Sequence, residues 1–184
     1  PKDALLSHRL QPLSEMFPYG AYFRAALKEP AAAQAMIQSA GLTYLGVLAF
    51  ETDQMQEGRA FFEKAVALSS INFPAFRYLT QVLAQLGAEP AEILAAFYQA
   101  VNLYPPELSQ LLPFGVTAEL AEGQESEAVA LLQQWVLFHL RVLQPTGEPL
   151  PLDPAAVAIV QEHRPLLDGW IGEAFDQMMQ NAAH

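Results

Sequence analysis

The stretch from Tyr44 to Leu68, YLGVLAFETDQMQEGRAFFEKAVAL, decides the fold of this 184-residue chain. Apolar residues recur at the spacing of one helix face on both sides of the polar segment ETDQ. They are Leu45, Leu48 and Ala49 before it, and Ala60, Phe61, Ala65 and Leu68 after it. Strand patterns are nearly absent from the sequence. The stretch therefore predicts two helices joined by a short turn.

A second hairpin of the same kind follows between Phe76 and Leu103. Gly87 is expected to end its first helix, and Pro90 to begin its second. Apolar residues of the first hairpin have apolar counterparts 34 or 35 positions later in the sequence. The pairs are Leu42 with Phe76, Tyr44 with Tyr78, Leu45 with Leu79, Ala49 with Leu83, Phe62 with Phe97, Ala65 with Ala100, and Leu68 with Leu103. The chain therefore contains a repeat.

The repeat resembles the tetratricopeptide repeat (TPR) in its period, in the small residue Gly46 and in the spacing Phe-x-x-Ala-x-x-Leu. Pro105 falls on the proline position of that family. Three positions depart from the family pattern: Gly58, Ser70 and Thr80. A more divergent third unit fits Leu112, Phe114, Gly123, Ala128 and Leu132, with Trp135 at the alanine position. The resemblance implies an all-α fold, a right-handed α-solenoid of TPR-like hairpins with a C-terminal helical pair.

Four parts are predicted along the chain. Residues 1–38 form an N-terminal helical cap or an eroded repeat, and residues 39–143 hold the repeats. Residues 144–152, with three prolines and a glycine, form a turn or linker. Residues 153–184 form C-terminal capping or docking helices, because Asp153 and Pro154 are a strong helix start.

Composition limits the classes of function. The formal net charge is -11, and residues 39–184 lack the basic face that nucleic acid requires. No apolar run is long enough for a membrane span, and the absence of cysteine excludes thiol chemistry and disulfides. The predicted location is cytoplasmic, or periplasmic if a leader has been removed.

The residue types that carry out catalysis show no pattern typical of an enzyme. The four histidines are scattered without metal-ligand spacing, and no nucleophile or phosphate-binding motif is present. Glu119, Glu122, Glu125 and Glu127 are interpreted as a solvated acidic face near a helix start. We expect no catalytic residues, no metal and no cofactor.

The TPR resemblance implies a concave groove lined by the first helix of each hairpin. The groove positions carried over are Thr43, Val47, Phe50 and Glu51, then Arg77, Gln81 and Gln85, then Thr117. Arg77 is the only cation among them, so the expected ligand is a neutral to mildly basic peptide or protein segment. Arg77→Glu is expected to abolish ligand capture without unfolding the protein.

Two functions remain open. The first is an adaptor or scaffold, as TPR-like modules are in bacterial secretion, polysaccharide or assembly systems. The second is a targeting domain of a larger enzyme such as a glycosyltransferase, with catalysis outside these residues. The coding sequence beyond His184 discriminates between them.

The last helix carries an apolar stripe that something must cover. Capping of the repeats is one interpretation, and docking to another chain through Trp170, Phe175 and Met178 is the other. Self-association through this helix is compatible with either function.

Overall fold

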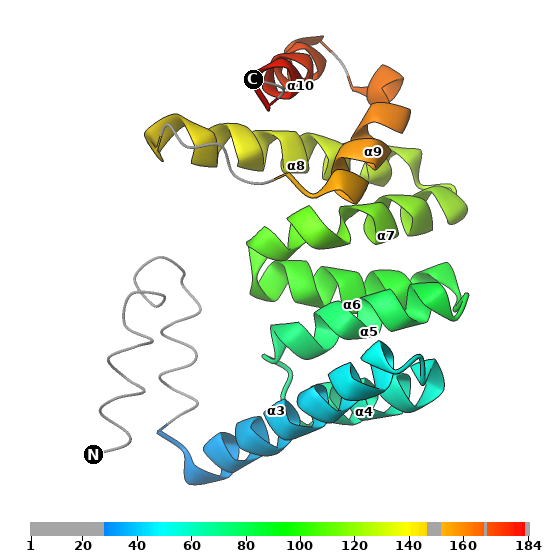
Figure 1. Cartoon of the computed structure of the whole chain (residues 1–184), viewed down its shortest axis with the longest axis vertical. Coiled ribbons are helices and arrows are strands. Elements are labelled where there is room, and N and C mark those ends of the chain that lie inside the picture. The colour runs from blue at the N-terminus through cyan, green and yellow to red at the C-terminus, as the bar shows by residue number, and fades with distance from the viewer. Residues whose placement is uncertain (1–27, 147–151, 168, 183–184) are drawn as a thin grey trace. The chain divides into compact units, whose positions relative to one another are not determined.

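The computed structural model describes residues 28–146, 152–167 and 169–182, and these residues are almost entirely helical (Figure 1). They contain no β-strand, so the all-α prediction is confirmed. The helices are α3 (Pro30–Glu51), α4 (Met55–Leu68), α5 (Phe73–Gln85), α6 (Pro90–Leu103), α7 (Leu108–Ala121), α8 (Glu125–Thr146), α9 (Pro154–Glu162) and α10 (Gly169–Ala182), with 3₁₀ turns η1 (Pro105–Glu107) and η2 (Arg164–Leu166). The chain divides into two compact units, residues 1–75 and 76–184, which are described in turn.

The first unit contains the hairpin of α3 and α4. α3 runs unbroken through the boundary predicted between residues 38 and 39. Gly41 weakens a helix by only about 1 kcal/mol relative to alanine, and packing against α4 outweighs that amount. Of the predicted N-terminal cap, residues 1–27 lie outside the described residues.

Gly46 permits the close approach of α3 and α4. A Cβ at this position would lie 2.5 Å from Cε1 of Phe62, whose side chain is completely buried. Because a ring edge enclosed in the core cannot move away, only glycine allows this contact. The small residue predicted from the repeat pattern thus has a packing reason in this hairpin.

Asn72 ties the start of α5 to α3. Its side-chain oxygen accepts from the backbone N–H of Ala75 (3.2 Å), which caps the helix. Its amide nitrogen donates to the hydroxyls of Ser39 (2.6 Å) and Thr43 (2.9 Å). The Ser39 hydroxyl in turn donates to the carbonyl of Ala65 in α4. These bonds connect Asn72 to α3 within the first unit, and the cap at Asn72 places the start of α5 three residues ahead of the predicted Phe76.

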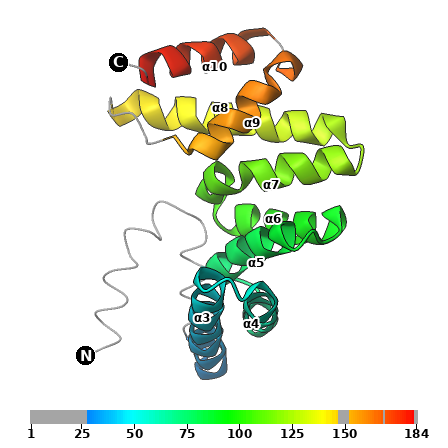
Figure 2. The same ribbon diagram turned by 45° about the vertical axis from the view of Figure 1, so that its right-hand side comes forward.

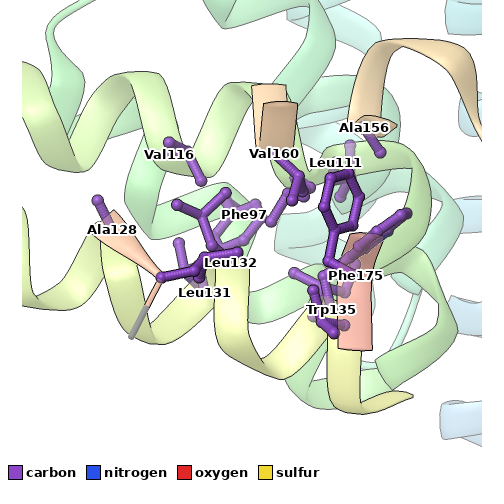
Figure 3. Packing of buried hydrophobic residues seen from close by; sticks show 14 of the residues in the cluster. Phe97, Leu111, Val116, Ala128, Leu131, Leu132, Trp135, Ala156, Val160 and Phe175 are labelled. Carbon is purple, nitrogen blue, oxygen red and sulfur yellow. The ribbon is translucent and has the colours of Figure 1, made fainter. Parts of the chain in front are cut away.

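The second unit stacks α6, α7, α8 and α10 in that order, with α9 packed against α7 (Figures 1 and 2). Its core is one apolar cluster that takes residues from each of these helices (Figure 3). Trp135 of α8 is completely buried there, with its ring 6.4 Å from that of Phe175 of α10. The tryptophan at the alanine position is thus accommodated by packing against α10.

The C-terminal segments differ slightly from their predicted bounds. α8 continues to Thr146, one residue past Pro145, so the first three residues of the predicted linker are helical. Residues 147–151 lie outside the described residues. Asp153 caps α9 as predicted, since its carboxylate accepts from the N–H groups of Ala155 and Ala156. The last helix begins at Gly169, after the 3₁₀ turn η2.

The first helix of each hairpin ends in the same backbone motif. Asp53, Gly87 and Gly123 follow α3, α5 and α7, with positive φ angles of 60°, 65° and 73°. The N–H of the next residue donates to a carbonyl five positions earlier, which is the long bond of a Schellman motif. These bonds join Gln54 to Ala49, Ala88 to Leu83, and Gln124 to Glu119. Three hairpins with one turn geometry make the helical arrangement repeat-like.

The motif at Asp53 predicts a stabilising substitution. A left-handed conformation is unfavourable for a residue with a Cβ and unstrained for glycine. Asp53→Gly is therefore expected to raise the free energy of unfolding by about 0.5–1 kcal/mol, measured by urea denaturation. The matched control is Gly87→Ala, whose Cβ would meet no atom within 4 Å, so its expected loss of about 1 kcal/mol comes from the backbone alone. A less stable Asp53→Gly variant would show that the aspartate side chain itself stabilises the turn.

Candidate functional site

The predicted groove residues of α3 have unequal exposure. Thr43 is buried, and its hydroxyl donates to the carbonyl of Ser39 (2.9 Å) and accepts from Asn72. Val47 and Phe50 are half-buried, and Glu51 is exposed. The Thr43 hydroxyl is thus used inside the first unit, and Glu51 is the predicted residue of α3 that water reaches most freely.

The predicted residues of α5 lie one helical turn apart. Arg77 and Gln81 are half-buried, and Gln85 is exposed. The guanidinium of Arg77 lies 4.6 Å from the centre of the Tyr78 ring, a cation–π contact. Thr117 of α7 is also exposed in this unit. The α5 face therefore presents two amide side chains beside a cation that is held by its neighbours.

Arg77 is paired with a buried carboxylate that the sequence reasoning missed. Nη1 of Arg77 lies 3.4 Å from Oε1 of Glu107, and the Glu107 side chain is only 5% exposed. The other carboxylate oxygen, Oε2, is buried and has no hydrogen-bond partner. Burial raises the pKa of Glu107, and the charge and hydrogen bond of Arg77 oppose that rise. Arg77 therefore stabilises a carboxylate that water does not reach.

The Arg77–Glu107 pair occupies the same repeat position as the Thr43–Asn72 contact in the first unit. Thr43 and Arg77 each lie ten residues before the positive-φ residue that follows their helix. Asn72 and Glu107 each precede the next helix of the chain, α5 and α7 respectively. The contacts Thr43–Asn72 and Arg77–Glu107 are thus equivalent links from a first helix to the start of the following hairpin. This equivalence gives both predicted groove residues a structural role.

Glu119 is a second buried carboxylate, which corrects its assignment to a solvated acidic face. It is 4% exposed and accepts a hydrogen bond from the hydroxyl of Tyr98 in α6. Burial and this contact raise the pKa of Tyr98. Glu122, Glu125 and Glu127 are exposed, as predicted. The bond between Tyr98 and Glu119 links α6 to α7 across hairpins.

His139 and Ser109 form the contact most similar to a catalytic pair. Nε2 of His139 lies 3.5 Å from the Ser109 hydroxyl, and Nδ1 lies 2.9 Å from the carbonyl oxygen of Trp135. The imidazole is 2% exposed, and burial lowers its pKa. A carbonyl, which accepts from Nδ1–H, occupies the place that a carboxylate has in a catalytic triad. The arrangement satisfies the hydrogen bonds of a neutral, buried histidine.

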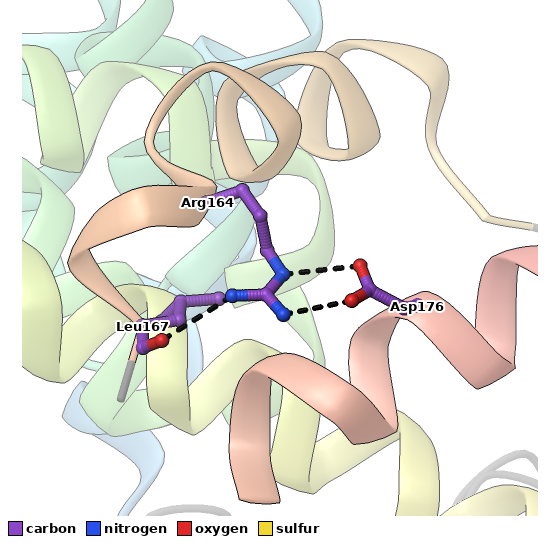
Figure 4. Close-up of polar contacts among 3 residues, drawn as sticks. All are labelled: Arg164, Leu167 and Asp176. Carbon is purple, nitrogen blue, oxygen red and sulfur yellow. Dashed lines mark hydrogen bonds and ion pairs between the residues drawn. The ribbon is translucent and has the colours of Figure 1, made fainter. Parts of the chain in front are cut away.

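The three residues predicted to dock a partner on the last helix differ in exposure. Phe175 and Met178 are buried in the core of the second unit, whereas Trp170 is 62% exposed. α10 is also held by Arg164, which donates two hydrogen bonds to Asp176 and one to the carbonyl of Leu167 (Figure 4). The stripe centred on Phe175 is therefore covered within the chain.

Four large apolar side chains on α3 are exposed. Ile37 is 73% exposed and Tyr44 is 65% exposed. Leu45 and Leu48 are also exposed, at 45% and 42%. Helical spacing shows that these residues share a side of α3, but it does not show which side the fold covers.

The described residues contain neither a metal-binding group nor a membrane span. No group of three or more histidine, aspartate or glutamate side chains there could hold a metal ion. Within the same ranges, every helix is too short or too polar to cross a membrane.

The sequence was also compared with known proteins. It matches no protein-family model and no curated protein. The geometry of the chain itself is therefore the basis for a functional proposal.

Proposed function

We propose that this chain is a non-catalytic protein-interaction module. In this proposal its hairpins stack as a TPR-like α-solenoid, and a segment of another protein binds along the face of α5 and α7. Stacked helical repeats expose one side of their first helices as an extended surface. The shared turn motif at Asp53, Gly87 and Gly123 supports a repeat of this kind.

One observation favours peptide binding on α5. Gln81 and Gln85 follow Arg77 at intervals of one helical turn, and Arg77 is paired with Glu107. Each glutamine amide has donors and an acceptor, as an extended peptide backbone does. Because the charge of Arg77 is opposed by Glu107, the face attracts no strongly acidic ligand. The ligand we propose is a neutral to mildly basic, partly apolar segment.

A peptide-library selection against the purified chain tests this proposal. Selected peptides are expected to bind wild type and to lose roughly thirtyfold in affinity to a Gln81→Ala, Gln85→Ala variant, because each lost hydrogen bond is worth about 1 kcal/mol. The matched control is Gln99→Ala, an exposed glutamine on the second helix α6, which should leave affinity unchanged. Equal binding to all three proteins, or no selected peptide, would remove the α5 face as the site.

A further inference from the structure

The exposed side of α3 has the form of a helix-packing surface. Ile37, Gly41 and Leu45 lie four residues apart, and so do Ala40, Tyr44 and Leu48. All six are exposed. Rows of residues at this spacing are the ridges by which one helix packs into the grooves of another. We refer to these six residues as the α3 stripe.

Gly41 lies at the centre of the α3 stripe, and the described fold gives no reason for a glycine there. Its backbone is helical, and a Cβ added to it would meet nothing within 4 Å. Glycine weakens a helix interior relative to alanine. Gly46, by contrast, is required by its contact with Phe62. A glycine in the middle of an exposed apolar row is what a second helix needs to cross at close range.

We propose that the helix crossing at Gly41 is α3 of a second copy of this chain. A two-fold contact is self-complementary, so each residue must meet a suitable residue of the same surface. Ile37 and Leu45 lie four residues on either side of Gly41. An antiparallel crossing at Gly41 therefore places Ile37 of one copy against Leu45 of the other, twice.

Charge favours the same occupant. The sequence from Pro30 to Phe50 contains no charged residue, although the whole chain has a net charge of -11. Two copies with this net charge repel each other overall, whereas the α3 stripe brings no like charges together. One helix per copy is less than the 20–30 residues a side of a standard interface. The dimer is thus weak and depends on concentration.

Sedimentation of the full chain over a range of concentrations tests the dimer. Wild type is expected to shift from monomer to dimer as concentration rises. An Ile37→Glu, Tyr44→Glu variant is expected to dimerise with an affinity at least tenfold weaker. The matched control is Trp170→Glu, an equally exposed apolar residue on α10. Circular dichroism shows whether each variant keeps its helices. A wild-type monomer at every concentration overturns the proposal, as does a dimer that only Trp170→Glu disrupts.

Cross-linking gives a second test that requires no loss of stability. The chain has no cysteine, so a single introduced cysteine can form a disulfide only with another copy. Ala40→Cys places the thiol next to the proposed two-fold axis, within the Cα separation of roughly 4–7 Å that a disulfide allows. Oxidation should cross-link this variant much faster than Trp170→Cys. Equal rates would exclude the α3 crossing, whether or not the α5 face binds peptides.

Discussion

Trp135→Ala is expected to lower the free energy of unfolding by about 3–5 kcal/mol, the range for a large aromatic ring removed from a core. Trp135 is completely buried among residues of α7, α8 and α10. Its ring centre lies 4.2 Å from that of His139 and 6.4 Å from that of Phe175. Because its Nε1 has no hydrogen-bond partner, the entire loss comes from packing. Urea denaturation followed by circular dichroism measures it.

Trp170→Ala is the matched control, since Trp170 is the other tryptophan of the chain and is 62% exposed. Its expected loss is under about 0.5 kcal/mol. Trp135→Phe should lose only about 1 kcal/mol, because it keeps a ring and removes an unpaired buried N–H. Equal losses for the two alanine variants would contradict the role given to Trp135 in joining α8 to α10.

Local signals in the sequence predicted three of the helix ends. Pro90 begins α6, Gly87 follows α5 in the left-handed conformation, and Asp153 caps α9. Each of these effects depends on one residue and its immediate neighbours, which a sequence displays directly. Asp53 performs the same function as Gly87 without a glycine. That turn was therefore located only by its polar neighbours.

Long-range pairing explains what the sequence could not predict. Arg77 and Glu107 are 30 residues apart, and Tyr98 and Glu119 are 21 apart. No local pattern distinguishes a carboxylate buried by such a contact from a solvated one. The exposure of the α3 stripe could not be predicted for a similar reason. A period of apolar residues marks one face of a helix, but it does not show which element covers that face. The sequence thus predicted which helices and which residue types form the candidate site. It did not predict the hydrogen bonds and the ion pair that hold these residues.

These bonds change the interpretation of the predicted groove. Thr43 and Arg77 occupy one repeat position and both connect to the start of the next hairpin. A residue with that structural role is a poor reporter of ligand binding, because its substitution affects folding as well. Gln81 and Gln85 lie farther along α5, one and two turns beyond Arg77. They are therefore the better probes of the proposed peptide surface.

Arg77→Glu is accordingly expected to destabilise the protein, in contrast to the expectation from sequence that it would remove only binding. It replaces the partner of a buried carboxylate with a second carboxylate. Breaking a buried ion pair from one side costs about 3–5 kcal/mol, and the 23% exposure of the Arg77 side chain favours the lower end. Thermal and urea denaturation near pH 7.5 measure the loss. Arg59→Glu, which reverses a charge in the exposed pair with Glu63, should lose less than about 1 kcal/mol.

The pH dependence and a second substitution separate this electrostatic cause from a change in packing. The pKa of Glu107 is already raised, and without Arg77 it should rise further. A carboxyl whose pKa is raised by folding stabilises the fold at low pH, and this contribution is lost as pH rises through the folded-state pKa. The stability defect of Arg77→Glu should therefore shrink as pH falls toward the ordinary pKa of a glutamate, about 4.3.

Adding Glu107→Gln to the Arg77→Glu variant removes the buried charge and should restore most of the stability near pH 7.5. A defect that persists in the double variant at every pH would mean that the arginine acts through its contact with Tyr78 rather than through its charge.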